Sequence, residues 1–185
     1  AKRAHVHLRP KPGTDVVLAM AIANYLIQEN LADFEYISKF TIGFDDFTER
    51  AQLFDLNFAA KITGVPISQI RDLALLISNH KAVAIRTGVA LERTANGGDA
   101  IRAIASIPAL IGAWTVPGGG MFQHPQSTFP INRAALTNPE SVEEGRHAVN
   151  LFDLANVLND NAEVIIKSLF VYNANPVIAV ANQTK

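Results

Sequence analysis

The sequence predicts an α/β fold, in which a parallel Rossmann-like sheet carries flanking helices and a helical insertion. Two segments, 81–87 and 165–172, contain apolar runs too short for helices, which predicts two buried strands, and a segment with helical character precedes each of them. Each run ends in a polar, turn-rich loop, at 88–93 and 173–176. Strands that alternate with helices favour a parallel sheet, whose ligands bind at the carboxyl ends of the strands. We therefore expect both loops to lie at one ligand-binding edge.

The first 80 residues read as a short strand followed by helices. Val6 and Leu8 alternate with histidines, which predicts a strand ending at Pro10. A turn then leads into an apolar helix that runs to about Gln28. Residues 33–63 are expected to form short helices with seven aromatic anchors, namely Phe34, Tyr36, Phe40, Phe44, Phe47, Phe54 and Phe58. A further helix starts at Val65-Pro66 and ends near Asn79-His80.

The remaining segments follow the strand at 81–87. Asn96 and the two glycines after it open a helix, which Pro108 is expected to kink. The segment 117–120 reads as a turn, and 121–141 as a long excursion without periodicity. A helix from about 142 to 158 then precedes the strand at 165–172.

Composition excludes several classes of site. The 185 residues contain no cysteine, which excludes disulfides, zinc–thiolate sites, iron–sulfur clusters and a cysteine nucleophile from this segment. The net charge of -1 gives no reason to expect nucleic acid as a partner. No run reaches the ~20 apolar residues that a membrane span needs, so we expect no membrane insertion by this segment. Charged residues make up only 18%, which suits a surface that packs against other parts of a larger protein.

Four motifs in order support a more specific interpretation. The set resembles the middle of the molybdopterin oxidoreductases of the dimethyl sulfoxide reductase family, and the likeness spans nearly the whole chain. Singly the motifs are weak, but their order and spacing are specific. They are Leu8-Arg9-Pro10-Lys11-Pro12-Gly13-Thr14-Asp15, the segment 88–98 with Arg102-Ala103-Ile104, Pro117-Gly118-Gly119-Gly120, and Tyr172-Asn173-Ala174-Asn175-Pro176.

The resemblance implies a cofactor and a domain plan. Family members hold molybdenum or tungsten between two molybdopterin guanine dinucleotides, each bound by one of two related α/β units. On this basis residues 1–32 are the tail of the first dinucleotide-binding unit, 33–80 a helical segment, and 81–185 a partial second Rossmann-like unit. The parent enzyme would transfer electrons, and often oxygen atoms, to or from a small substrate. The resemblance also implies a metal ligand upstream and, in some members, an iron–sulfur cluster in an N-terminal domain.

The turn at Gly13, Thr14 and Asp15 is the first candidate site. In the family the acid of this turn binds guanine, because a carboxylate can accept hydrogen bonds from the guanine N1 and N2 donors. A structural interpretation stands beside it: Thr14 caps a helix, and Asp15 interacts favourably with the helix dipole.

The segment 88–98 is the second candidate. A strand that leads through Gly88 to a helix N-terminus presents free amide groups to a diphosphate, and Gly97 permits close approach of backbone. Arg93 could neutralise a phosphate or face the metal cavity, whereas Asn96 could equally be a structural N-cap. Many family members have Gln where Glu92 stands, and this acid changes the local charge. The absence of G-x-G-x-x-G argues against a nicotinamide dinucleotide.

The third candidate is the turn formed by Asn173, Asn175 and Pro176. In the family it lies against the second dinucleotide, and the Asn175 amide could bind a pterin or phosphate. The alternative is an Asn-Pro turn without a ligand. For 117–120 a plain turn and a cofactor contact remain equally open. The five histidines show no metal-ligand spacing, so no metal site and no catalytic residue is expected within this chain.

We therefore expect an internal piece of a larger oxidoreductase, inactive when isolated and with weak affinity for the dinucleotide at most. Its expected partners are the remaining domains of the parent chain and an electron-transfer subunit. The alternatives are a nucleotide-binding module without redox chemistry and a purely structural domain. Substrate, choice of metal and compartment (cytoplasmic or periplasmic) do not follow from these residues.

Overall fold

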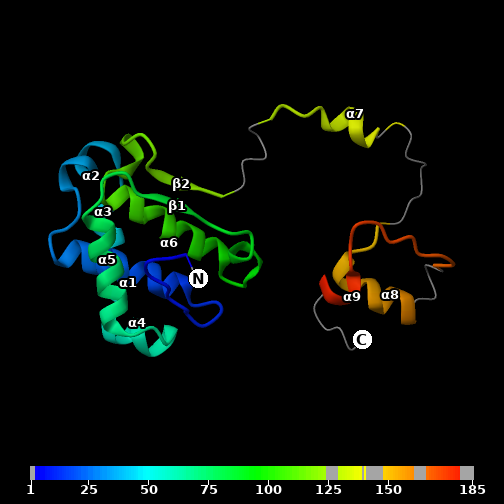
Figure 1. Cartoon of the computed structure of the whole chain (residues 1–185), viewed down its shortest axis with the longest axis horizontal. Helices are drawn as coiled ribbons and strands as arrows, with labels where there is room; N and C mark the ends of the chain where they lie inside the picture. The colour runs from blue at the N-terminus through cyan, green and yellow to red at the C-terminus, as the bar shows by residue number, and fades with distance from the viewer. Residues whose placement is uncertain (1–2, 124–128, 139, 141–147, 161–165, 180–185) are drawn as a thin grey trace. The chain divides into compact units, whose positions relative to one another are not determined.

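The computed structural model describes residues 3–123, 129–138, 140, 148–160 and 166–179. These residues fall into two compact units, 1–128 and 129–185 (Figure 1). None of the helices in the described part of the chain combines the length and apolar character that a membrane span needs. The first unit contains most of the secondary structure and the two strands of the described sheet.

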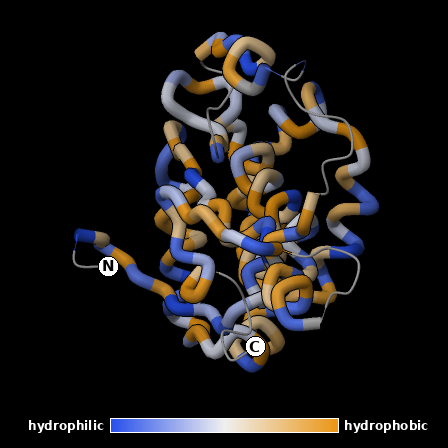
Figure 2. The backbone as a smooth tube through the Cα atoms, turned by 90° about the vertical axis from the view of Figure 1, so that its right-hand side faces the viewer, coloured by the Kyte–Doolittle hydropathy of each residue, from blue (hydrophilic) through white to orange (hydrophobic). Residues whose placement is uncertain are grey.

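Helix α1 (Asp15–Gln28) is the centre of the first unit. It packs against α6 (Gly97–Leu110), α5 (Ile67–Ser78), α4 (Leu56–Thr63) and α3 (Phe44–Ala51). Small side chains on α1 let its neighbours approach closely. Figure 2 shows hydrophobic and hydrophilic residues interspersed along the backbone of the whole chain. The buried residues of α1 are Ala19, Met20, Ala21, Ile22, Ala23, Asn24 and Leu26.

The end of α1 is set by Asn30. This residue adopts the left-handed conformation, with φ of 57°. Its N–H donates to the carbonyl of Ile27 at 3.2 Å, and the N–H of Leu31 donates to the carbonyl of Leu26 at 2.8 Å. This pair of bonds is a Schellman motif, in which the last free carbonyls of a helix are satisfied by the residues that leave it. The chain can therefore turn at once into α2.

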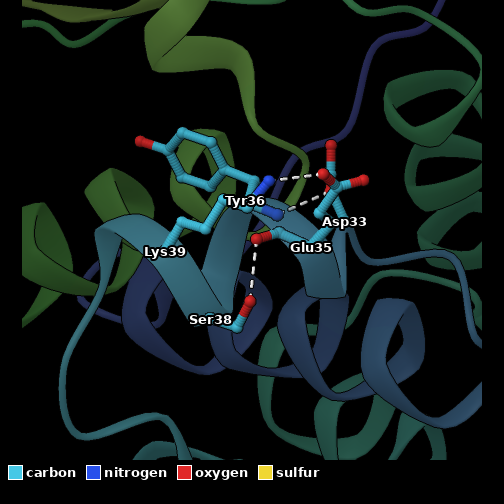
Figure 3. Close-up of polar contacts among 5 residues, drawn as sticks. All are labelled: Asp33, Glu35, Tyr36, Ser38 and Lys39. Atoms are coloured by element: carbon cyan, nitrogen blue, oxygen red, sulfur yellow. Dashed lines mark hydrogen bonds and ion pairs between the residues drawn. The ribbon is translucent and has the colours of Figure 1, made fainter.

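Helix α2 (Phe34–Phe40) is short and is held by local polar contacts (Figure 3). Oδ1 of Asp33 accepts a hydrogen bond from the N–H of Tyr36 at 2.9 Å, which makes Asp33 a side-chain N-cap. Lys39 forms an ion pair with Glu35 at 2.6 Å, one helical turn away. The backbone N–H of Asp33 also donates to the carbonyl of Leu110 at 2.7 Å, which ties the start of α2 to the end of α6.

The sheet consists of two parallel strands, β1 (Ala84–Arg86) and β2 (Gly120–Phe122). Helix α6 and the 3₁₀ turn η2 (Ala113–Thr115) connect them, so the segment from β1 to β2 is a β–α–β unit. The register pairs Ala84 with Gly120 and Arg86 with Phe122. The prediction of a parallel sheet with helices is thus confirmed in a small, mainly helical form.

Two details of the predicted strands are wrong. The run at 81–87 does contain a strand, but Ala84 and Arg86 are exposed, so it is not a fully buried one. Its partner is β2, within segments that we expected to be a turn and an irregular excursion. A strand of Gly, Met and Phe carries little pattern of its own, and it forms because the β–α–β crossover brings it beside β1.

The strand predicted near the N-terminus is wrong, whereas the helices predicted after it are confirmed. Residues 5–8 form no strand, and Lys11 is held instead by its backbone N–H, which donates to the carbonyl of Thr63 at 2.9 Å. The helices expected at 15–28, within 33–63 and after Val65-Pro66 are confirmed. Helix α6 continues through the buried Pro108 to Leu110.

The described residues of the second unit include three short helices and a 3₁₀ turn. They are α7 (Arg133–Thr137), η4 (Leu151–Asp153), α8 (Leu154–Asp160) and α9 (Pro176–Ala179). The helix expected at 142–158 is an α-helix only from Leu154, while 148–150 are not helical and 141–147 lie outside the described residues.

The strand expected at 165–172 is wrong for its described part. Residues 166–172 form no strand, and Phe170 and Tyr172 are 90% and 82% exposed. No hydrogen bond joins the backbone of this segment to another described segment. An apolar, β-branched run has a strand's composition, but a strand is stabilised by its cross-strand partners and by burial.

Candidate functional site

The carboxyl end of β1 carries a buried polar residue that sequence reasoning missed. Thr87 is only 4% exposed, and its N–H donates to the carbonyl of Phe122 at 3.1 Å, which extends the pairing with β2. Among the described residues its hydroxyl oxygen has no hydrogen-bond partner. An unpaired buried hydroxyl costs about 1–3 kcal/mol, so it marks a place where a partner is absent. The signal in the sequence was a lone polar residue at the end of an apolar run, just before Gly88.

The loop after β1 is pressed against the start of α6. It contains the 3₁₀ turn η1 (Leu91–Arg93) and ends at the buried Gly97. A Cβ on Gly97 would lie 2.3 Å from the carbonyl oxygen of Leu91 and 2.8 Å from Cα of Glu92. The close approach that this glycine permits is therefore between two segments of the protein itself. A Cβ on Gly88, by contrast, would have no atom within 4 Å.

Asn96 joins two of the predicted site segments. It occupies the N-cap position of α6, but its side chain makes no capping hydrogen bond. Instead, Nδ2 of Asn96 donates to the carbonyl of Gly13 at 2.9 Å, across 83 residues of sequence. The structure thereby brings the turn before α1 against the N-terminus of α6, where no side chain caps the first-turn amides.

The turn before α1 also lacks a side-chain cap. Gly13 has a φ of +78°, a left-handed conformation that glycine adopts without strain. The Thr14 hydroxyl donates to the carbonyl of Lys11 at 2.6 Å, so the expectation that Thr14 caps the helix with its side chain is wrong. Asp15 is half-buried in the first turn of α1, and among the described residues its carboxylate has no ion-pair partner.

A second polar contact crosses the ends of the two strands. Nε2 of Gln123, the residue after β2, donates to Oε1 of Glu92 at 2.8 Å. Arg93 is exposed, and no ion pair of the described residues involves it. Sequence reasoning singled out Glu92 and Arg93 but missed Gln123, which has no motif around it.

The turn at 117–120 packs against protein atoms. A Cβ on Gly119 would lie 2.2 Å from the carbonyl oxygen of Ala113, and one on Gly120 would lie 2.8 Å from the ring of Trp114. These glycines are needed because backbone and an indole ring pass close to them. This steric role is shown, whereas a cofactor contact of the same residues is not.

The third predicted turn belongs to the second unit. Asn173 has a positive φ of 49°, and Oδ1 of Asn175 accepts from the N–H of Ile178 at 3.3 Å. Pro176 is the first residue of α9. In this geometry Asn175 caps a helical turn, which is the structural alternative considered for it. Cofactor binding by these three residues stays a prediction.

A cavity of about 290 Å³ lies elsewhere, near the carboxyl end of α1. Its lining contains none of the predicted site residues and comprises Asn24, Tyr25, Gln28, Glu29, Leu56 and Arg71. In the part of the chain that the structure describes, no group of three or more His, Asp or Glu side chains could hold a metal ion. The carboxyl edge of the sheet, where the turn before α1 meets the N-terminus of α6, is the candidate site.

A β–α–β unit with uncapped helix N-termini at its carboxyl edge is characteristic of proteins that bind nucleotides or dinucleotide cofactors. Comparisons with known proteins are more specific. The family model for molybdopterin oxidoreductases matches residues 1–185. The chain is 34% identical over 177 residues to the probable oxidoreductase YoaE of Bacillus subtilis, covering 95% of this chain and 26% of that protein.

Two further relatives agree. The dimethyl sulfoxide reductase DmsA of Haemophilus influenzae is 34% identical, with 70% of this chain and 19% of that protein covered. The solved structure of acetylene hydratase from Pelobacter acetylenicus superposes with a TM-score of 0.60 at 30% identity, covering 62% of this chain and 16% of that chain. The chain belongs to the molybdopterin oxidoreductase family, and the resemblance to the dimethyl sulfoxide reductase family is confirmed. It spans about a quarter or less of the length of these relatives.

Proposed function

We propose that this chain is part of a molybdenum or tungsten oxidoreductase and binds molybdopterin guanine dinucleotide at the carboxyl edge of β1 and β2. The observation that carries the proposal is the hydrogen bond from Asn96 to the carbonyl of Gly13. It brings the turn expected to bind the guanine of one dinucleotide, at the end of the proposed first unit, against the loop expected to bind phosphate, at the start of the proposed second unit. Family membership supplies the identity of the ligand.

In this proposal Asp15 recognises guanine. Its carboxylate is half-buried and unpaired by any described cation, so it is available to accept two hydrogen bonds from the guanine N1 and N2 groups. Gly13 and Thr14 shape the turn that presents it. Adenine offers no such pair of donors, so a guanine preference is the expected signature.

The diphosphate would lie at the N-terminus of α6. The amides of the first turn carry no side-chain cap, although the N–H of Gly97 donates to the carbonyl of Thr94 at 3.0 Å, and the exposed Arg93 adds a positive charge to the loop that precedes them. Thr87 supplies a buried hydroxyl for which the described part of the chain offers no partner, and Gly88 leaves open space directly after it. These features fit an anionic, hydrogen-bonding group such as a pterin dinucleotide.

The finer points of the domain plan belong to the same proposal. We propose that 81–185 is a partial Rossmann-like unit, that 33–80 is a helical segment and that 1–32 is the tail of a first unit. The predicted role of Asn173, Asn175 and Pro176 toward the second dinucleotide is part of it.

The bound cofactor would supply the redox centre of the parent enzyme, whose reaction is electron transfer and often oxygen-atom transfer. This chain would bind and orient the dinucleotide, together with other domains of the parent protein. We propose that the chain alone has no turnover and binds the dinucleotide weakly, because several domains share its contacts. Reduction of an oxide substrate by the purified chain with an artificial electron donor would refute this.

Nucleotide titration of the full chain, followed by NMR, tests the proposal. Guanosine diphosphate should shift the amide signals of Asp15 and of 88–98 at lower concentration than adenosine diphosphate. Asp15→Asn should weaken the binding of guanosine diphosphate by about tenfold or more, as expected when a charge-assisted hydrogen bond is lost. Asp45→Asn is the matched control, since Asp45 lies in the first turn of α3. A preference for adenine would instead indicate a nucleotide-binding module of another kind.

A further inference from the structure

Glu92, in the loop between β1 and α6, is held from two sides. On one side, the backbone of Glu92 lies against Gly97, where even a methyl group would meet Cα of Glu92 at 2.8 Å. On the other side, the carboxylate of Glu92 accepts the hydrogen bond from Gln123 at 2.8 Å. Within the loop, the N–H of Leu91 donates to the carbonyl of Gly88 and the N–H of Arg93 to the carbonyl of Ala90, while the carbonyl of Leu91 accepts from the N–H and the hydroxyl of Thr94.

The contact with Gln123 links parts of the chain that are distant in sequence. Glu92 follows β1, whereas Gln123 follows β2, 31 residues later. This contact lies just beyond the last backbone hydrogen bond between the strands, which the N–H of Thr87 donates to the carbonyl of Phe122. Because η1 is a 3₁₀ turn with three residues per turn, successive side chains leave it about 120° apart. Fixing the direction of Glu92 therefore also fixes the direction of Arg93.

We propose that Gln123 is a positioning residue, which holds Glu92 toward β2 and thereby directs Arg93 toward the N-terminus of α6. The inference rests on the proposed function, since Arg93 is the cation of the proposed phosphate site. It also accounts for an acid in a loop that would bind phosphate. The amide of Gln123 binds the carboxylate at the end of β2, so the negative charge is held toward β2, about 120° around the turn from Arg93.

The decisive comparison is between Glu92→Gln and Glu92→Ala in the full chain. Both variants remove the same negative charge, but only the glutamine can still accept a hydrogen bond from Gln123. Glu92 is exposed, so neither variant is expected to unfold the chain, which circular dichroism checks. Gln123→Leu removes the donor instead, and Gln52→Leu is its control at another exposed glutamine of the first unit.

Two measurements separate this inference from the proposed function. Amide hydrogen exchange of residues 88–96, without ligand, should be about fivefold faster in Glu92→Ala and Gln123→Leu than in Glu92→Gln, as expected for one lost hydrogen bond. Inorganic pyrophosphate should bind Glu92→Gln about fivefold more tightly than Glu92→Ala. Equal exchange and equal affinity in the two Glu92 variants would overturn the inference. If amide exchange differs between the two Glu92 variants but neither binds pyrophosphate, the hydrogen bond from Gln123 does hold the loop, and the proposed phosphate site is wrong.

Discussion

Substitution of Gly97 by alanine tests the packing on which the candidate site depends. The added Cβ would lie 2.3 Å from the carbonyl oxygen of Leu91 and 2.8 Å from Cα of Glu92. Ordinary contacts start near 3.4 Å, so backbone must move by about 1 Å on one side. Overpacking of this kind costs about 1–3 kcal/mol, and backbone is less able to yield than a side chain. We expect a loss of about 2–3 kcal/mol in the free energy of unfolding.

Urea denaturation of the full chain measures this loss. With a slope of about 2 kcal/mol per molar urea, the midpoint should fall by about 1 M or more. Gly98→Ala is the matched control, because the next glycine has open space around its Cβ position and lies in the same helix. That variant should gain up to about 1 kcal/mol from helix propensity. A Gly97→Ala protein as stable as the control would refute the argument that the loop and α6 are in close contact.

Three other substitutions have expected outcomes of their own. Asn30→Val should lower the free energy of unfolding by about 1–2 kcal/mol, because a β-branched residue is strained in the left-handed conformation that Asn30 adopts after α1. A urea midpoint equal to that of the unsubstituted chain would contradict the Schellman assignment. Thr87→Val should raise the free energy of unfolding by about 1 kcal/mol, because it removes a buried hydroxyl that has no partner among the described residues. The same variant should bind pyrophosphate more weakly in an NMR titration. A loss of stability would show that the hydroxyl has a protein partner. Asn96→Ala should cost about 1 kcal/mol in the same denaturation and should broaden or shift the amide signal of Thr14, whereas an unchanged spectrum there would show that the bond to Gly13 does not form in solution.

The helical part of the fold followed from local signals. Apolar periodicity, a Thr-Asp start and a Pro at the head of a helix placed α1 and α5 within one or two residues of their observed bounds. The strands were harder. The apolar, β-branched run at 166–172 looked like a strand but has no partner among the described residues, whereas Gly120–Phe122 carried no pattern and is one. A helix closes its hydrogen bonds within itself, but a strand needs a neighbour that may be far away in sequence.

For the candidate site too, some features could be predicted from the sequence and others could not. Its family could be identified from ordered motifs, and the structure brings two of the segments that carry them, Gly13–Asp15 and Gly88–Gly97, together through the hydrogen bond from Asn96 to Gly13. The roles of individual residues could not. Asn96 reads as a helix cap and instead donates to Gly13, and Thr87 and Gln123 stand in no motif.

The sequence by itself determined that this chain belongs to the molybdopterin oxidoreductase family and where α1 and α5 begin and end. Only the tertiary structure decided which strands pair, that the turn before α1 meets the head of α6, and that Gly97 is required by protein backbone. The physical reason is the range of the interactions. Helix propensity, caps and turns act over a few residues, whereas the 83-residue separation of Asn96 from Gly13 is bridged only after α1 and α6 have packed together.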